Sequence, residues 1–317
     1  MPGPLVSVIT PTLNADAFLE ETIQTVLAQT YEPIEHLISD GGSTDRTLEI
    51  AKRYERENPG RVRVVSEPGS YIWALRNKGL RESRGELVCP LDADDLWDPA
   101  KTERQVALME SRPELGFTYT HFEAFDSASG ERLEWSDDSA GFEGDLLVPL
   151  WVKAAFIGTL TLMWRRDALD DHVVRMGRET ADFGGDRQFA DDQWVLMGVS
   201  LTRPAAHLPE RLARFRRHPA SFSVRFTEAG NVHLAYIEMM RRFVRENPAA
   251  RDRLGEWHDI GIAHRLAGAA GYELDRGRPW RARAHRLRAR LLDGRGLLPE
   301  AELDALMAEL DGVTLDS

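Results

Sequence analysis

The sequence predicts an α/β fold with a mainly parallel sheet, flanking helices and a helical C-terminal extension. Over the first 120 residues, short apolar strands alternate with single amphipathic helices. This alternation implies right-handed βαβ crossovers, which place neighbouring strands parallel in one sheet. Beyond about residue 227 the pattern becomes wholly helical.

The elements of the first 120 residues follow one another in regular order. Strands are expected at residues 5–10, 34–39, 61–66 and 86–91, and helices at 16–29, 46–58 and 71–83. Asp16 is predicted to cap the first helix, and Asp45 to cap the second. Pro90 lacks a ladder donor, so regular pairing of the fourth strand is expected to stop there.

This rhythm breaks from about residue 121. Residues 126–150 are interpreted as surface loops and short strands, residues 156–164 as a further strand, and residues 188–200 as a helix. Three tryptophans of this region, Trp135, Trp151 and Trp194, are expected in the core. The alternative is that they stack on a ring of a bound ligand.

Composition narrows the class of protein. The 317 residues are 42% hydrophobic, enough for a sizeable core, and the net charge of −12 argues against broad nucleic-acid binding. The single cysteine, Cys89, excludes an internal disulfide and suits a reducing cytoplasm. Neither a signal peptide nor a stretch long enough for a membrane span is visible, so a soluble cytoplasmic protein is expected.

An apolar run that begins at Glu86 ends abruptly in three carboxylates, Asp92, Asp94 and Asp95. Residues i and i+2 share one face of an extended chain, so Asp92 and Asp94 can address the same ligand. Carboxylate oxygens suit Mg²⁺ or Mn²⁺, ions that also bind phosphate. We therefore expect Asp94 to hold a metal that bridges a diphosphate, Asp92 to bind a ribose hydroxyl, and Asp95 to support them or cap a helix. The alternative is an acidic turn before a helix near Pro99.

Polar groups also follow the first two strands, at the edge of the sheet where Asp92 and Asp94 are expected. The first strand leads into Thr10-Pro11-Thr12-Leu13-Asn14 and the second into Asp40-Gly41-Gly42-Ser43. Asp40 could accept a hydrogen bond from the ring N–H of a pyrimidine or from a ribose hydroxyl. In the alternative interpretation it only caps the next helix.

Asp191 and Asp192 precede an apolar helical segment. A carboxylate there could act as a general base and take a proton from an acceptor hydroxyl. Aspartates are also favoured at helix N-termini for purely electrostatic reasons. The residues alone leave both interpretations open.

Two cationic segments could face a nucleotide. A predicted loop joins cations, an imidazole and hydroxyls in Arg216, Arg217, His218, Ser221 and Ser223. This loop could close over a diphosphate, with His218 as a metal ligand or without a special role. Arg76 and Asn77, on the helix before the acidic cluster, could contact the nucleotide or lie on a solvated face.

These pieces, in this order, resemble the inverting glycosyltransferases of family 2, which have the GT-A nucleotide-sugar fold. The matching stretches are Val6–Asn14, Ser39–Asp45, Arg76–Gly79, Gly85–Asp95 and Arg216–His218 with Ser221 and Ser223. The first four cover residues 5–110 and are specific as a set. Residues 111–225 match more loosely, and those beyond about 228 carry no motif.

The resemblance implies a role for each matching residue. The nucleotide site would include Thr10, Pro11, Thr12, Asn14, Asp40, Arg76, Asn77, Asp92 and Ala93. Asp40 would contact the base, Asp92 the ribose, and Asp94 the divalent metal. Asp192 would be the catalytic base, and His218 would lie near the metal and the diphosphate.

Three departures from the family pattern matter. Asp191 stands where the family has glutamate, which leaves open whether Asp191 or Asp192 is the base. Gly41 stands where many relatives have a second aspartate, which affects base or ribose recognition. The Gln-x-x-Arg-Trp motif of processive synthases is absent, so addition of a single sugar is expected.

The resemblance thus implies transfer of one sugar from a nucleoside-diphosphate donor, first of all a UDP-sugar, with Mn²⁺ or Mg²⁺. The acceptor would be a saccharide, a lipid-linked or another hydroxyl, in cell-surface polysaccharide or glycoconjugate synthesis. Residues 1–120 would bind the donor and 121–227 the acceptor. Residues 228–317 would pack on the acceptor side or mediate association of two copies. The arginine-rich stretch 276–295 would lie in solvent or, in the alternative, against anionic lipid at the inner face of the membrane.

Three alternative functions can be compared with this one. A sugar nucleotidyltransferase has a similar fold but opens with a glycine-rich phosphate loop, and no glycine occurs between Thr10 and Gly41. A Rossmann dehydrogenase fails for the same reason. The non-enzymatic rival is a nucleotide-binding or scaffold protein that keeps the fold without turnover.

Overall fold

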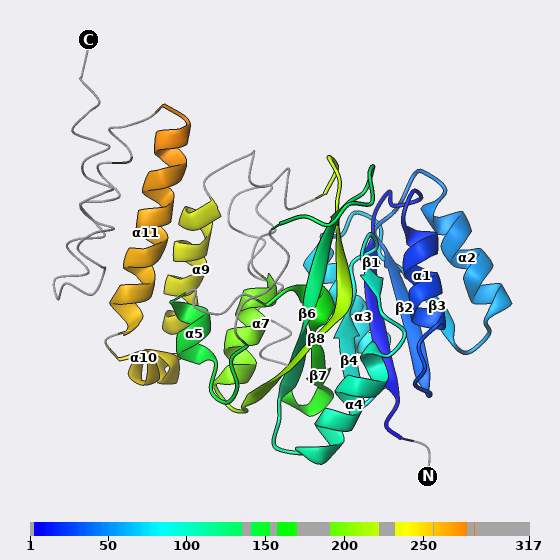
Figure 1. Cartoon of the computed structure of the whole chain (residues 1–317), viewed down its shortest axis with the longest axis horizontal. Coiled ribbons are helices and arrows are strands. Elements are labelled where there is room, and N and C mark those ends of the chain that lie inside the picture. Colours follow the sequence, from blue (N-terminus) through cyan, green and yellow to red (C-terminus); the bar gives the residue numbers. More distant parts are fainter. Residues whose placement is uncertain are drawn as a thin grey trace. The chain divides into compact units, whose positions relative to one another are not determined.

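The computed structural model of the chain describes residues 3–134, 141–152, 157–169, 191–221, 232–255, 257–277 and 282. Contacts within the chain divide it into two compact units. One unit comprises Met1–Leu146 and Ala155–Ser221, and the other comprises Leu147–Ala154 and Phe222–Ser317. The sheet lies in the first unit, and the second is helical (Figure 1).

An eight-stranded sheet runs through the first unit in the order β3-β2-β1-β4-β7-β6-β8-β5. The strands are β1 (Val6–Thr12), β2 (Ile34–Asp40), β3 (Val62–Ser66), β4 (Leu87–Pro90), β5 (Leu96–Trp97), β6 (Phe117–Asp126), β7 (Met163–Arg165) and β8 (Ala205–Arg217). The first four strands of the sheet order are parallel, β7 is antiparallel to β4 and β6, and β6 pairs in parallel with β8. The α/β class and the mainly parallel first half are therefore confirmed.

Helices flank this sheet in the first unit (Figure 1). They are α1 (Leu19–Leu27), α2 (Thr47–Glu57), α3 (Ile72–Glu82), α4 (Lys101–Ser111) and α7 (Asp191–Ser200), with the 3₁₀ turns η1 (Thr159–Thr161) and η2 (Arg166–Ala168). The second unit contains α5 (Leu147–Trp151), α9 (Val232–Glu246), α10 (Pro248–Leu254) and α11 (Trp257–Asp275). Among the residues described, no helix combines the length and apolar character that a bilayer crossing requires.

The first seven predicted elements form close to their expected bounds, because their apolar faces are buried as the pattern requires. Every residue of β1 and β2 is buried, as expected for parallel strands covered on both faces. The prediction for Asp16 was wrong: α1 starts after Phe18 without a side-chain cap, and the Asp16 carboxylate instead accepts the N–H of Arg46. Asp45 accepts the N–H of Thr47 at 2.9 Å, at the start of α2.

Two long strands, β6 and β8, are absent from the sequence prediction. β8 contains Pro209, which argues against a strand because proline cannot donate to a ladder. The register jumps at this point: Leu208 pairs with Thr120, but Arg211 pairs with the next residue, His121. Pro209 therefore sits in a bulge, where no ladder hydrogen bond is needed. Arg216 and Arg217 end this strand, so their assignment to a loop was wrong.

The segment predicted as one strand over residues 156–164 instead forms the η1 turn followed by the short strand β7. The apolar side chains of this segment are buried. The run of apolar residues therefore indicated burial correctly but did not indicate a strand. Trp151 and Trp194 are buried at 1% and 0% exposure, which confirms the core interpretation for both. Trp135 lies outside the described residues.

A lysine is buried inside the first unit. Lys101 is fully buried at the start of α4, where its ammonium donates to Gln105 Oε1 at 2.6 Å and lies 4.0 Å from the ring of Trp97. Burial lowers the pKa of Lys101 from 10.5 to about 8. A buried cation with so few partners destabilises the folded state.

This burial predicts a pH dependence of stability. Between about pH 8 and 10.5 the unfolded chain still binds the Lys101 proton while the folded chain has released it, so the free energy of unfolding rises with pH. Below pH 8 both states are charged and the contribution is flat. Lys101→Met is expected to lose this rise, measured as urea unfolding at pH 7.5 and 10. Equal pH slopes for the two proteins would contradict it.

Candidate active site

Strand ends converge at the carboxyl edge of the sheet. Thr12 and Asp40 are paired in the parallel register of β1 and β2, and the N–H of Gly41 donates to the Thr12 carbonyl at 2.9 Å. β4 lies on the other side of β1 and ends at Pro90, two residues before Asp92. The polar groups that follow these three strands therefore come to one edge, as the sequence predicted.

The acidic turn after β4 alternates between buried and accessible residues. Asp92 and Asp94 are partly exposed, whereas Ala93 and Asp95 are buried. The hydroxyl of Thr22, on α1, lies 3.0 Å from the carbonyl oxygens of both Ala93 and Asp95. This shared contact fixes the turn, so that the Asp92 and Asp94 carboxylates face outward together.

Asp94 and His218 meet although 124 residues separate them. Their side chains join through Asp94 Oδ2 and His218 Nε2 at 2.9 Å, at the end of β8. The His218 ring also lies against Phe18, with ring centroids 4.4 Å apart. A carboxylate oxygen and an imidazole nitrogen thus come to one point, the pair of residues that the sequence suggested as metal ligands.

Arg216 links the acidic turn to α1. Its backbone N–H donates to Asp95 Oδ1 at 3.0 Å, its Nε–H donates to the Asp94 carbonyl at 2.8 Å, and its guanidinium bonds Glu21 at 2.5 Å. Burial raises the pKa of the Asp95 carboxyl well above its usual range, and the Asp94 and Asp92 carboxylates add to this rise. Arg216 is 7% exposed, so these contacts position the acidic turn. Arg217 is exposed, and Ser223 lies outside the described residues.

Arg76 connects α3 to the acidic turn. Its Nη2 lies 2.7 Å from Asp92 Oδ1, and the two side chains are only 17% and 30% exposed. A partly buried charged hydrogen bond of this length fixes both groups. Asn77 follows Arg76 on the same helix and lines a cavity described below.

Asp40 is buried and closes its own loop. Its carboxylate accepts the Gly42 N–H at 2.9 Å and the Ser43 hydroxyl at 2.5 Å. Asn14, at the end of β1, has a positive φ of 52° and accepts the Thr44 N–H at 2.8 Å. The two loops that follow β1 and β2 are therefore tied to each other, and a role for Asp40 toward a base stays a prediction.

The buried residues at the end of β1 differ in hydrogen bonding. Thr10 and Pro11 are buried, and the Thr10 hydroxyl lies 2.8 Å from His36 Nε2. The Thr12 hydroxyl is buried and meets no hydrogen-bond partner in the described part of the chain. Thr12 thus carries an enclosed hydroxyl that lacks a partner, whereas the Thr10 hydroxyl is used inside the sheet.

Two exposed apolar side chains at this edge were missed by sequence reasoning. Leu13 is 55% exposed and Tyr71 is 42% exposed. Thr12 directly precedes Leu13, and Ser70 directly precedes Tyr71. The backbone carbonyls of Thr12 and Ser70 both lie beside Gly41, 3.6 and 3.4 Å from the position that a Cβ would take there. Leu13 and Tyr71 therefore start from neighbouring points of the backbone. Their signal in the sequence was an apolar residue inside a polar loop.

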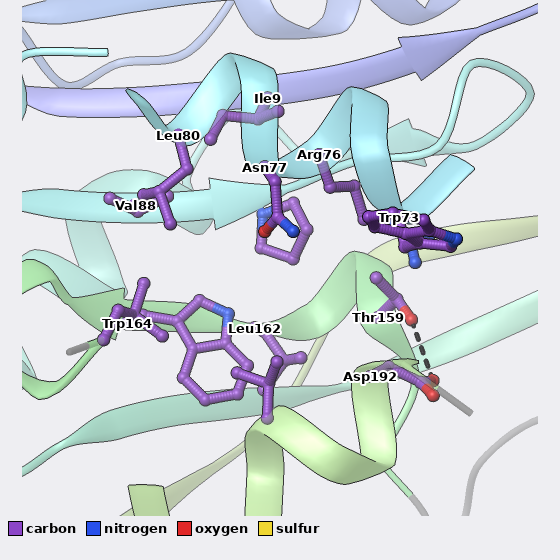
Figure 2. Close-up of a pocket in the computed structure, with 13 residues that line it drawn as sticks. Ile9, Trp73, Arg76, Asn77, Leu80, Val88, Thr159, Leu162, Trp164 and Asp192 are labelled. Carbon is purple, nitrogen blue, oxygen red and sulfur yellow. Dashed lines mark hydrogen bonds between the residues drawn. The ribbon is translucent and has the colours of Figure 1, made fainter. Parts of the chain in front are cut away.

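Asp192 lines a cavity of about 90 Å³ together with Arg76, Asn77 and Trp73 (Figure 2). It lies in the first turn of α7, and its Oδ2 accepts the Thr159 hydroxyl at 3.2 Å. The predicted base therefore lies in one pocket with the helix that carries Arg76. Nothing is described for the Asp191 side chain.

The family model of glycosyl transferase family 2 matches residues 7–172, just over half of the chain. This chain belongs to that family. The chain is similar to a Bacillus subtilis protein named "Putative teichuronic acid biosynthesis glycosyltransferase TuaG", with 35% identity over 167 residues. The match covers 52% of this chain and 63% of that relative, so the chain spans less than two thirds of the relative's length.

Two solved structures share the fold. The mannosyltransferase PcManGT of Pyrobaculum calidifontis, in complex with GDP-Man and Mn²⁺, has a TM-score of 0.60 and 19% identity, and the match covers 97% of this chain and 80% of that one. TarS residues 1–349 of S. aureus, in complex with UDP-GlcNAc, has a TM-score of 0.56 and 16% identity, with 93% and 91% covered. The fold is therefore GT-A, as the resemblance implied.

Proposed function

We propose that this glycosyltransferase is a metal-dependent, inverting enzyme that moves one sugar from a UDP-sugar to an acceptor hydroxyl. The observation that carries the proposal is the meeting of Asp94 with His218 beside the Arg76–Asp92 pair. The acceptor is a saccharide, a lipid-linked or another hydroxyl in cell-surface polymer or glycoconjugate synthesis. The name of the TuaG relative supports this class of product.

The donor atoms at this corner fit a divalent cation. The described residues contain no group of three or more His, Cys, Asp or Glu arranged to hold a metal. Mg²⁺ and similar ions are commonly held by one or two protein carboxylates together with substrate phosphates and water. Asp94 and His218 would hold Mn²⁺ or Mg²⁺ in this way. The cation would neutralise negative charge on the diphosphate leaving group.

The remaining residues bind and orient the reactants. Asp92, fixed by Arg76, takes a ribose hydroxyl, and Thr12 lies at the edge of the sheet where the nucleotide binds. Leu13 and Tyr71 present apolar surface on which a planar base can stack.

Asp192 takes the proton of the acceptor hydroxyl on the opposite face of the sugar from the diphosphate. A single displacement then inverts the anomeric centre without an enzyme nucleophile. The Thr159 hydroxyl holds the Asp192 carboxylate in place. Asp191 is the alternative base. We place the end of the catalytic domain at residue 227, with residues 228–317 as a helical extension.

Thermal unfolding with nucleotides tests the donor site. UDP, dTDP, GDP and CDP are each added with and without Mn²⁺ at high concentration. At about 100 times the dissociation constant, a bound ligand stabilises the fold by about 2.7 kcal/mol, which is readily detected. We expect a Mn²⁺-dependent shift with UDP. No shift with any nucleotide would refute a nucleotide-sugar site, and a shift with a different nucleotide alone would refute the choice of UDP.

A further inference from the structure

Among the described residues two arginines are buried, and they differ in their partners. Arg216 is 7% exposed and is bonded to the acidic turn and to Glu21, as described above. Arg265, on α11 in the helical second unit, is 6% exposed. It makes no hydrogen bond or ion pair with any residue that the structure describes. The burial of Arg265 is therefore not explained by an internal partner for its charge.

Arg265 lies against the neighbouring helix α9, which packs beside α11 (Figure 1). The guanidinium carbon is 3.8 Å from the centroid of the Tyr236 ring on α9. One turn further along both helices, the His233 ring lies against Gly268, so close that a Cβ there would meet it at 2.4 Å. The ring of Tyr236 thus covers one face of the guanidinium. The N–H groups point along the guanidinium plane and are left for other partners.

Burial of this guanidinium is unfavourable as long as nothing binds to it. Burial lowers the pKa of Arg265, but arginine stays protonated in proteins and cannot release its charge as Lys101 can. The Tyr236 ring offsets only part of the lost hydration. The Nε atom is enclosed without an acceptor, whereas the two terminal nitrogens, which also lack one, are not enclosed. They keep accessible surface, so an acceptor from outside can reach them.

The chemistry of Arg265 selects an oxyanion as its ligand. The planar fork of the two terminal nitrogens matches two oxygens of one phosphate or carboxylate group. A terminal phosphate carries about −1.5 to −2 charges at neutral pH, more than a carboxylate, and interacts more strongly with a partly desolvated cation. Since no described carboxylate neutralises Arg265, its full charge is available to the ligand. The small accessible surface admits an end group rather than a whole molecule.

We propose that Arg265 is the centre of an oxyanion site in the helical unit, and that this site takes a terminal phosphate group. The two terminal nitrogens donate to two phosphate oxygens, while the Tyr236 ring holds the plane of the guanidinium. The rest of the ligand stays outside the helices. Free phosphate and the headgroup of a phosphatidic acid lipid present the same chemistry. The site goes beyond the proposed sugar transfer and does not depend on it.

Calorimetric titration of the full chain with orthophosphate, at constant ionic strength and without Mn²⁺, tests the site. The wild type is expected to bind phosphate saturably, and Arg265→Met to bind it about tenfold or more weakly. Arg265→Lys keeps the charge but loses the fork, and is expected to lie between the two. Arg276→Met is the matched control, since Arg276 also lies over a tyrosine ring of α11, at 4.7 Å, but is exposed. This control is expected to bind phosphate like the wild type.

Urea unfolding without phosphate checks that the variants fold. Arg265→Met is expected to be at least as stable as the wild type, because it replaces a buried unpaired charge by an apolar side chain of similar length. A less stable variant would mean that the charge already has a partner inside the protein, and would overturn the inference.

Two further measurements identify the source of the phosphate. Sedimentation with vesicles compares phosphatidylcholine alone with phosphatidylcholine that contains phosphatidic acid, and titration with acetate compares a carboxylate. Phosphate binding that is lost in Arg265→Met supports a free phosphate ligand. Binding to the phosphatidic acid vesicles alone, lost in the same variant, supports a lipid headgroup. Equal binding by wild type and Arg265→Met, acetate bound as tightly as phosphate, or no binding in either assay would overturn the site.

Discussion

Asp94→Asn is expected to abolish Mn²⁺-dependent donor binding and to lower sugar transfer at least about a hundredfold. The amide keeps the shape of the side chain but removes the negative charge that would hold the metal and that lies 2.9 Å from His218 Nε2. Loss of metal assistance removes several kcal/mol of stabilisation of the leaving diphosphate, and each 1.36 kcal/mol corresponds to a factor of ten. The measurements are UDP release from the bound UDP-sugar and the thermal shift with UDP and Mn²⁺.

Asp167→Asn provides a matched control, because it makes the same change of charge at an exposed position. Asp167 pairs with Arg203 at 3.0 Å, and its side chain is 64% exposed. Exposed pairs of this kind contribute about 0–1 kcal/mol, so both binding and transfer are expected to stay at the wild-type level. A fully active Asp94→Asn protein would contradict the metal role of the carboxylate.

Asp192→Asn is expected to separate binding from catalysis. Removing a general base lowers transfer about 10²–10⁴-fold, since the acceptor hydroxyl then attacks without losing its proton to the enzyme. Donor binding is expected to stay unchanged, because the proposed nucleotide and metal ligands do not include Asp192. UDP release with saturating Mn²⁺ measures the first effect, and titration with UDP measures the second.

Asp191→Asn is the companion variant, because the family glutamate is replaced at this position. We expect it to keep most of the activity if Asp192 is the base. The reverse pattern, an active Asp192→Asn protein and an inactive Asp191→Asn protein, would exchange the two roles. Full activity in both variants would mean that another group is the base, or that the chain binds a nucleotide without turnover.

The sequence predicted the first half of the fold well because its signals are local. Each strand from β1 to β4 is an apolar run, and each helix between them has one apolar face. Such an element can be recognised from its own residues, without knowing what it packs against. The second half failed where such signals conflict with pairing. Strand β8 was missed because it contains Pro209. The bulge that accommodates Pro209 depends on how β8 pairs with β6. The apolar run before Trp164 indicated burial but not the η1 turn.

Part of the candidate site was also predictable from the sequence, and part was not. Parallel strands end at one edge, so the sequence alone placed Asp40, Asp92 and Asp94 together there. It did not show that Asp40 closes its own loop, or that Arg216 supports the acidic turn instead of lying free in a loop. Leu13 and Tyr71 were missed because the exposure of an apolar residue is decided by what covers it.

By itself, therefore, the sequence determined the α/β class, the family and the positions of the acidic groups. The family resemblance suggested that Asp94 and His218 serve one metal, but only the tertiary structure showed their direct contact and placed Trp73 in the cavity of Asp192. The reason is physical: hydrophobic periodicity reports which side of one element is buried, over a few residues at a time. A contact across 124 residues depends on the register of a bulged strand and on the packing of helices, which no local pattern encodes.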